Sequence, residues 1–348
     1  MSLSRRHFLR GSAQITLAAP LLGVASPLLA AASAPETGPP AGIDYALISK
    51  PYVGKKVSAK DITRQQVGGL TLFAGSGCNV VALSGPDGAL LVDGGQAINA
   101  SLLLKAVHAE LGTRRIHTLL NTHWHPDQTG LNEAAGKDGA AIISHEVTRL
   151  ALARKLRSPL FDGTIGPLPQ IAGPTKTTYD DGAFDFAGEP VHYHHLPGAH
   201  TGGDLYVYFP KRNVLVAGGP VASDRWPVID YLNGGFMHGF VRSYDLLCEL
   251  VKPDTLVIPA NGPVLTGADL VKMKDLYWQL FRQFFVLFNK GFGPTDVVQF
   301  NAGKEFKGVV PVVAERPLIG HPLLQQLGDP GRFLEFAYRS AELATLPF

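Results

Sequence analysis

The sequence predicts an α/β fold of four layers, in which two stacked β-sheets carry helices on both outer faces. Short apolar strand patterns alternate with helical patterns over roughly 200 residues, which is typical of sheets covered by helices. Histidines and glycines gather where several of these strands end, and functional sites are commonly built on such loops. The chain of 348 residues is 45% hydrophobic and 17% charged, a composition typical of globular proteins.

The strands are recognised as apolar runs bounded by glycine, proline or asparagine. In chain order, the expected strands are residues 70–73, 79–83, 88–95 (with a terminal turn), 116–121, 191–196, 204–209, 214–217 and 256–259. Residues 100–111 have the spacing of an amphipathic helix between the third and fourth strands.

A long helix is expected after the last strand. Thr266 and Asp269 resemble a capping box at its start, and Gly291 suits its end. Its expected core stripe is Leu270, Met273, Leu276, Leu280, Phe284 and Leu287. Neighbouring aromatic residues widen the apolar face to about 200°, beyond the ordinary face of about 100°. We therefore expect residues 301–348 to cover this helix as a helical C-terminal extension; a subunit contact or a substrate-pocket wall is the alternative.

The first 32 residues are expected to be a signal peptide. Residues 4–10 contain the pair Arg5 and Arg6 and resemble the twin-arginine export signal, and an uncharged, moderately apolar stretch follows at 13–32. Two prolines interrupt that stretch, so a stable membrane span is not expected, although a permanent anchor is the alternative. The expected location is the periplasm, and the expected export partner is the twin-arginine machinery.

The charge balance argues against nucleic acid as a partner. Arg5, Arg6 and Arg10 lie in the signal segment, and without them the chain has 28 basic against 29 acidic residues. A basic surface is therefore not indicated. A small-molecule substrate is expected instead, and the sequence leaves homo-oligomer formation open.

The chemistry centres on residues 123–128, His-Trp-His-Pro-Asp-Gln, directly after the strand at 116–121. On an extended segment, residues two apart point the same way, so His123 and His125 can reach one ion. Asp127 is expected to open a helix that starts near Gln128. A catalytic zinc site uses three protein ligands and one open position, so a third ligand must come from elsewhere in the chain.

These residues resemble the HxHxDH motif of the metallo-β-lactamase superfamily, whose further motifs follow in order. The resemblance implies the four-layer αββα sandwich of that family and a metal site of His123, His125 and His200. The segments that carry the resemblance beyond the motif are residues 91–95, 198–204, 214–219 and 257–263.

Three positions depart from the family pattern. Gln128 and Asn261 stand where the family has histidine, and Gly219 stands where it has a bridging aspartate. Zinc prefers imidazole, thiolate or carboxylate ligands, which none of these residues offers. We therefore expect a degenerate second metal position and one bound ion, zinc or another divalent metal. Restoring all three family residues should raise the metal content, provided that the new side chains fit.

Two functions follow from these residues. The first is a hydrolase in which one ion, held by three histidines, activates water against an ester, amide or lactone-type bond. Asp127 is then the catalytic residue that orients the water or accepts its proton, with helix N-capping as its structural alternative. The second function is that of a non-catalytic relative that binds a ligand or a partner protein. The retained histidines favour the hydrolase, whereas the three substitutions favour the binding relative.

Other histidines and the cysteines are less informative. His238 lies in a glycine-rich segment and is expected either to approach the pocket or to lie on a surface loop. The remaining histidines outside the signal segment are expected to be strand, surface or structural residues: His108, His117, His145, His192, His194, His195 and His321. Cys78 and Cys248 would reach an oxidising compartment, yet we expect two thiols rather than a disulfide.

The expected domain organisation follows from these segments. Residues 1–32 form the signal peptide, and 33–60 a linker with an N-terminal segment. Residues 61–300 form the metallo-β-lactamase-like domain, and 301–348 the extension that packs on it.

Overall fold

The structure, a computed structural model, describes residues 51–301 and 327–343, apart from residues 159 and 328. The expected signal peptide, His321 and most of the C-terminal extension lie outside the described residues. Within the described residues, no helix is long and apolar enough to cross a membrane.

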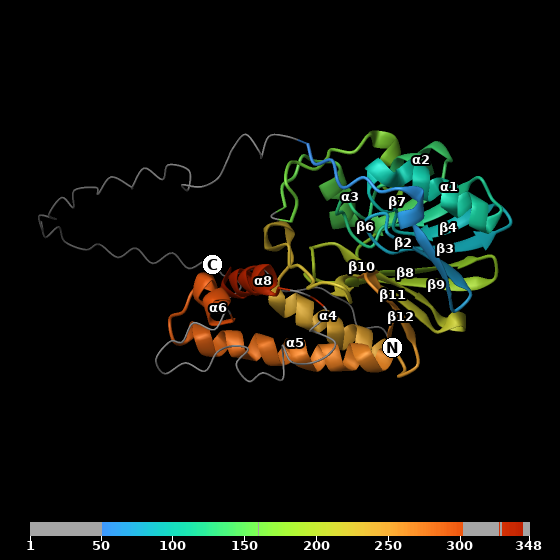
Figure 1. Cartoon of the computed structure of the whole chain (residues 1–348). Helices are drawn as coiled ribbons and strands as arrows, with labels where there is room; N and C mark the ends of the chain where they lie inside the picture. The colour runs from blue at the N-terminus through green and yellow to red at the C-terminus, as the bar shows by residue number, and fades with distance from the viewer. Residues whose placement is uncertain (1–50, 159, 302–326, 328, 344–348) are drawn as a thin grey trace, which may run out of the picture. The chain divides into compact units, whose positions relative to one another are not determined.

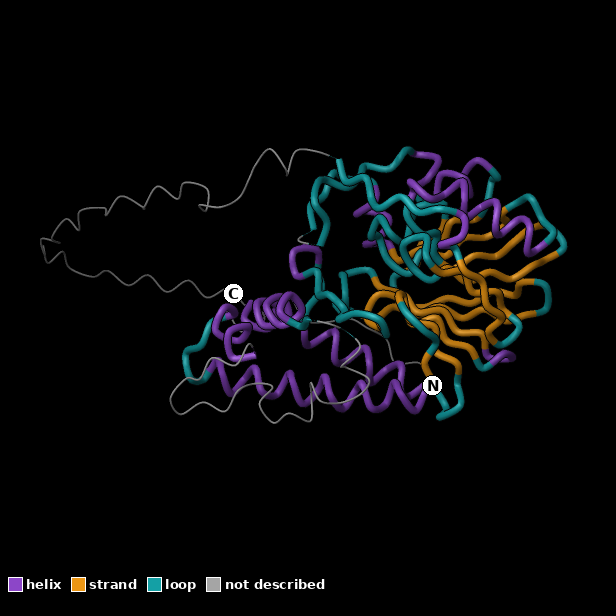
Figure 2. Tube along the Cα trace, in the orientation of Figure 1, coloured by secondary structure: helices purple, strands orange, loops and turns teal. Residues whose placement is uncertain are grey.

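Two mixed β-sheets form the centre of the fold (Figures 1 and 2). Strands β1 to β4 of the first sheet are joined by antiparallel pairing, and β4 to β7 run parallel. The strands of this sheet, in spatial order, are β1 (Thr63–Val67), β2 (Leu70–Ala74), β3 (Val80–Gly85), β4 (Gly88–Val92), β5 (Ile116–Leu120), β6 (Ala141–His145) and β7 (Lys176–Thr178).

In the second sheet only the β11–β12 pair is parallel. Its strands, in spatial order, are β13 (Leu265–Thr266), β12 (Leu256–Asn261), β11 (Val214–Ala222), β10 (Asp204–Phe209), β9 (Glu189–Leu196) and β8 (Asp181–Phe186).

Helices cover the outer face of each sheet, which completes four layers (Figure 1). The first sheet carries α1 (Ala100–Leu111) and α2 (Asn132–Lys137), with α3 (Glu146–Leu152) after β6. The second sheet carries α4 (Met237–Leu250), α5 (Gly267–Phe288) and α8 (Gly331–Leu343), and α6 (Pro294–Asn301) packs against α8. The predicted fold class is therefore confirmed.

Strand β4 shows why an unbroken apolar run suits this fold. Leu90 and Val92 point into the core between the two sheets, whereas Ala89 and Leu91 point into the core under α1. Because side chains alternate along a strand, a strand buried on both faces needs apolar residues at every position.

The predicted helices are mostly confirmed, with one correction. Helix α5 begins with the Thr266–Asp269 capping box, and its predicted core stripe is buried. Residues of α8 cover it, as predicted for the C-terminal extension, through Phe333, Ala337 and Ala341. The helix predicted to start near Gln128 is wrong, because residues 126–128 form a turn and α2 begins at Asn132.

Candidate metal centre

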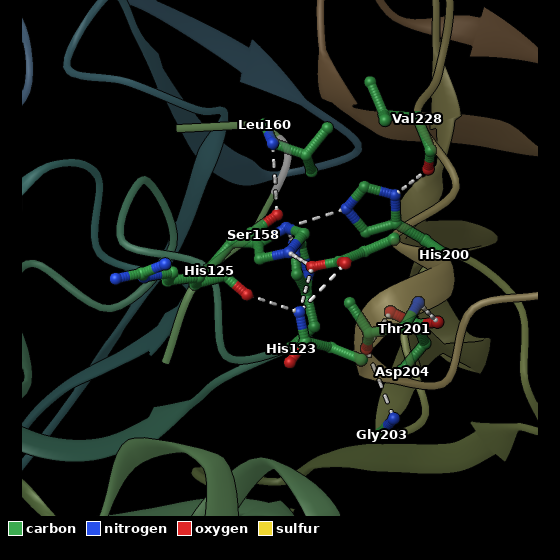
Figure 3. A network of polar contacts seen from close by, with 12 residues as sticks. His123, His125, Ser158, Leu160, His200, Thr201, Gly203, Asp204 and Val228 are labelled. Carbon is green, nitrogen blue, oxygen red and sulfur yellow. Dashed lines mark hydrogen bonds and ion pairs between the residues drawn. The ribbon is translucent and has the colours of Figure 1, made fainter. Parts of the chain in front are cut away.

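Three imidazole rings meet where β5 and β9 end. His123 and His125 lie on the loop after β5, and His200 lies between β9 and β10. His125 Nδ1 is 3.1 Å from His123 Nε2 and 2.9 Å from His200 Nε2, and all three residues are buried (Figure 3). Ligands of a tetrahedral zinc ion with bonds of about 2.0–2.1 Å lie about 3.3 Å apart, so the spacing is close to that of an ion site.

The other nitrogen of each ring has a hydrogen-bond acceptor. His125 Nε2 donates to Asp230 Oδ2 at 3.0 Å, and His200 Nδ1 donates to the Val228 carbonyl (Figure 3). His123 Nδ1 lies 3.1 Å from Thr122 Oγ1, which donates its own proton to Asp93 and so accepts from the ring. These partners assign the tautomers: the three nitrogens that face one another carry lone pairs, not protons.

This donor set fits a divalent cation. Burial, followed by the neighbouring imidazoles, holds the pKa of His123 well below its usual value, and burial also lowers the pKa of His125 and His200. In neutral rings with these tautomers, the lone pairs that face one another repel unless a cation lies between them. Acceptors behind ligating histidines are the usual support of metal sites. Within the described ranges, the side chains of His, Cys, Asp and Glu form no other group of three or more that could hold a metal ion.

Two further buried side chains, Asp93 and Asp204, fix the loops that carry the histidines. Asp93 accepts from the backbone N–H and the hydroxyl of Thr122, both at 2.8 Å. Asp204 accepts in the same way from Thr201, at 2.6 and 2.9 Å (Figure 3). Burial raises the pKa of each carboxyl to about 8, against the effect of these hydrogen bonds. Each threonine adjoins a histidine, so these pairs set where His123 and His200 lie.

Asp230 is the functional residue that the sequence analysis missed. It is fully buried, and its backbone N–H donates to the His200 carbonyl at 2.9 Å. The Asn233 amide donates to both of its carboxylate oxygens, at 2.9 and 3.0 Å. Asp230 thus orients His125 directly and holds the loop of His200. No motif marks it, because 105 residues separate it from His125.

Asp127 lines a cavity together with the three histidines, but it does not cap a helix. Its turn is followed by α2 only at Asn132, and Asp127 Oδ1 has no hydrogen-bond partner among the described residues. Burial raises the pKa of Asp127 to about 6, and the charge of Arg225 opposes that rise. The helix-cap alternative for Asp127 is therefore wrong.

The three positions that depart from the family pattern lie beside the histidines. Gln128 is buried with its side-chain oxygen unpartnered among the described residues, and Asn261 is partly exposed. A Cβ on Gly219 would lie 2.3 Å from His200 Cδ2 and 3.1 Å from His123 Cε1. Restoring aspartate at position 219 was expected to raise the metal content only if the new side chain fits. It does not fit, because the imidazole rings of His200 and His123 fill the space that it needs.

A cavity of about 180 Å³ opens onto the histidines. Its wall includes Asp127, Gln128, Gly219 and Asn261, together with Phe161. Of the two alternatives expected for His238, approach to this pocket or a place on a surface loop, the first is wrong. His238 is exposed on the first turn of α4, with its ring 6.0 Å from Phe281, and it is not part of the cavity wall.

The histidines of β9 that precede His200 pack against rings on other strands. His195 stacks on His145 with ring centroids 3.8 Å apart, and its Nε2 lies 3.2 Å from the Gly202 carbonyl oxygen. His194 stacks on Tyr206 at 5.2 Å. These contacts agree with the prediction of ordinary strand positions. Both Cys78 and Cys248 are free thiols, as expected.

A family model and a curated protein match the chain. The model of the metallo-β-lactamase superfamily matches residues 74–262, more than half of the chain. A linear primary-alkylsulfatase from Pseudomonas sp. (strain ATCC 19151) is 22% identical over 259 residues, which cover 62% of this chain and 48% of that protein. The chain therefore spans about half the length of this curated relative.

Two solved structures show the same fold. The stereoselective inverting sec-alkylsulfatase Pisa1 from Pseudomonas sp. superposes with a TM-score of 0.54 and 16% identity, over 80% of this chain and 51% of that chain. DIM-1 metallo-β-lactamase superposes with a TM-score of 0.50 and 17% identity, over 62% of this chain and 97% of that chain.

Proposed function

The chain belongs to the metallo-β-lactamase superfamily, and we propose that it is an exported hydrolase that works with one divalent metal ion, zinc by preference. The observation that carries this proposal is the convergence of three unprotonated imidazole nitrogens, each backed by an acceptor on its far side. Such an arrangement would be unfavourable without a cation, and imidazole is a preferred zinc ligand.

His123, His125 and His200 would hold the ion, which when bound activates water and polarises the bond to be cleaved. Asp127 is the residue proposed to handle the proton. Asp127 lines the cavity together with the three histidines, and its Oδ1 has no hydrogen-bond partner in the described part of the chain, which leaves it available to accept the proton that the attacking water loses. The nearby charge of Arg225 favours the carboxylate form that this role requires.

A single ion is proposed because the second position is degenerate. Gly219 offers no ligand atom, and the amides of Gln128 and Asn261 offer only neutral oxygens. The rings of His123 and His200 also fill the space beside Gly219. The purified protein should therefore hold close to one zinc per chain by elemental analysis, and His200→Ala should lose most of it. Two tightly bound ions would contradict this proposal.

Turnover by the metal-loaded protein separates a hydrolase from a non-catalytic relative. Alkyl sulfate esters are the first substrates to test, because two alkylsulfatases are among the similar proteins. Carboxylic esters, amides and lactones complete the panel. Hydrolysis that is lost on chelation and regained on adding zinc supports the enzyme; a fully loaded protein that is inactive on the whole panel supports the binding relative.

The role of Asp127 is tested by Asp127→Asn, which keeps the shape but cannot accept a proton. Loss of a general base lowers kcat by about 10²- to 10⁴-fold, while metal content should remain near that of the wild type. Asp87→Asn, at an exposed turn residue, is the matched control. If the Asp127→Asn variant turned over substrate as fast as the wild type, Asp127 would not be the proton acceptor.

We also propose that the N-terminal segment exports the folded protein to the periplasm. Replacing both Arg5 and Arg6 by lysine should leave the protein in the cytoplasm, measured by cell fractionation. Undiminished periplasmic delivery of that variant would contradict the twin-arginine route.

A further inference from the structure

Gln128 has a buried side chain whose polar end is not used by the described part of the chain. Only 1% of its surface is exposed, and its side-chain oxygen Oε1 has no hydrogen-bond partner among the described residues. A buried polar atom without a partner costs free energy, so in a native protein it calls for a partner from outside the chain. Gln128 also lines the cavity that contains the three histidines, so a ligand in that cavity can supply the partner.

The backbone of Gln128 is fixed at both of its polar groups. Its N–H donates to the His125 carbonyl at 3.0 Å, and its carbonyl accepts from the Gly94 N–H at 2.6 Å. The first bond ties Gln128 to one of the three histidines, and the second ties it to the loop after β4. The side chain therefore cannot gain a partner through a shift of the main chain unless these bonds break.

The unpartnered atoms of this cavity wall are acceptors. Among the described residues of the wall, the buried side-chain atoms without a partner are Asp127 Oδ1 and Gln128 Oε1, and both are oxygens. The guanidinium of Arg225, by contrast, donates to both oxygens of Asp224 at 2.8 Å, and Arg332 also interacts within the chain. The wall therefore needs O–H or N–H donors, and its cationic side chains already have partners.

The two acceptors differ in what they can accept from. Asp127 is the residue proposed to take the proton of the attacking water, which leaves Gln128 for another donor. A metal ion is a poor partner for Gln128, because an amide oxygen is neutral and zinc prefers imidazole, thiolate or carboxylate ligands. The remaining source of a donor is the substrate itself.

The size of the cavity places that donor close to the reacting bond. A dry cavity of about 150 Å³ holds one benzene molecule, so about 180 Å³ holds the bond to be cleaved and the few atoms next to it. Leu160, Phe161 and Pro227 on the same wall offer no polar side-chain atom. They cannot distinguish a substrate that has a donor from one that lacks it, whereas Gln128 can.

We propose that Gln128 is a specificity-determining residue, whose side-chain oxygen accepts a hydrogen bond from an N–H or O–H group of the substrate. An amide carries such an N–H on the bond that is cleaved, and a hydroxy ester carries an O–H beside that bond. A simple alkyl ester or a lactone carries neither. This inference rests on the proposed hydrolase function, and it names the class of substrate that the site selects.

Binding of two pairs of small ligands tests Gln128 without requiring turnover. Acetohydroxamate and N-methylacetohydroxamate both bind zinc through two oxygens, but only the first has an N–H group. Glycolate and methoxyacetate differ in the same way by an O–H group. All four are titrated into the zinc-loaded protein by calorimetry. In at least one pair the compound with the donor should bind about tenfold more tightly or better, because its partner leaves Oε1 unpaired. The pair that shows this preference identifies the donor as N–H or O–H.

Gln128→Met tests whether the preference comes from Gln128, because methionine keeps the length of the side chain and removes the amide oxygen. The variant should bind both members of the pair about equally, while its zinc content stays at the wild-type level. Gln128→Leu, of similar size, is a second variant for which the same result is expected. Gln65→Met, at an exposed position of β1, is the matched control and should keep the full preference.

Four results would overturn the proposal. The wild type could bind none of the four compounds, or it could bind both members of each pair equally, as expected if the amide presented its N–H groups instead of its oxygen. A preference that persists in both Gln128 variants would come from the shape of the cavity. Loss of zinc in these variants would make Gln128 a support of the ion.

Failure of this inference can be distinguished from failure of the proposed function. A wild type that shows the preference through Gln128 but hydrolyses nothing would contradict the hydrolase and support the role of Gln128. A wild type that hydrolyses a substrate, yet shows no preference in either pair, would do the reverse.

Discussion

Gly219→Ala adds one methyl group beside the proposed metal centre and is expected to disrupt it. The new Cβ would lie 2.3 Å from His200 Cδ2 and 2.8 Å from its Cγ, whereas non-bonded carbons approach to about 3.5–4.0 Å. The His200 ring would therefore have to move by roughly 1 Å or more. It is held on one side by the Val228 carbonyl, and on the other it faces His125.

A displacement of that size exceeds what a metal site accepts, because ligand distances are kept within about 0.2 Å. Changes that only disturb the orientation of a ligand cost about 10- to 100-fold in metal affinity, so we expect at least this loss for Gly219→Ala. Zinc affinity is measured by competition with a chromogenic chelator, together with the content of secondary structure.

The matched control is Gly202→Ala, on the loop of His200. A Cβ there would meet its nearest atoms at 3.4 Å, an ordinary contact, and the residue does not have a left-handed backbone. Gly202→Ala should bind zinc like the wild type. Unchanged zinc affinity in Gly219→Ala would refute the argument, since it would mean that the imidazoles are free to leave the space they occupy. By the same reasoning, Gly219→Asp should lower the metal content instead of adding a second ion.

Three further outcomes follow from the described contacts. Asp230→Asn should lower zinc affinity by about 10- to 100-fold with the fold retained, measured by chelator competition; an unchanged affinity would contradict its role in orienting the ligand. Burial and then His145 lower the pKa of His195 to about 4, below its ordinary value in the unfolded chain. As the pH falls, His195 therefore becomes protonated in the unfolded chain before it does so in the folded chain. Its contribution to stability is complete above about pH 6.5 and is lost as the pH falls toward 4. The melting temperature of His195→Gln should depend less on pH in that window than the melting temperature of the wild type. An identical dependence would show that the His195–His145 pair does not cause the loss of stability. Phe333→Ala should cost about 3–5 kcal/mol of stability in chemical denaturation, because a buried ring stacked on Trp226 is lost; a cost below 1 kcal/mol would show that α8 contributes little.

The sequence predicted most of the strands that are buried on both faces, but it missed β6, although four of its five residues are buried. Strand β10 and helix α1 were predicted with their observed ends. Strand β1 was missed because four of its five residues are exposed, so it has no apolar pattern. Strand β8 was missed because only one of its six residues is buried. Edge strands of this kind form through pairing with a neighbour, which periodicity does not report.

At the metal centre, the sequence predicted what local spacing determines. His123 and His125 are two apart on one loop, and the order of motifs pointed to His200. The sequence could not predict which acceptors orient the rings, because Asp230 and Val228 reach them only through the tertiary fold. The sequence also suggested that restoring aspartate at position 219 would help to rebuild the second metal position. The missing ligand is visible in the sequence, but the His200 ring that occupies its place is visible only in the structure.

The support of this centre extends beyond the region that matches the family. Val228 and Asp230, which orient His200 and His125, lie on the segment after β11, and Trp226 on that segment stacks on Phe333 of α8. The family match ends at residue 262, before α8 begins. A helix outside the match therefore packs against the segment that supplies two of the three acceptors behind the histidines. It follows that removing α8 should loosen the metal centre as well as expose the core, whereas a purely peripheral extension would affect stability alone.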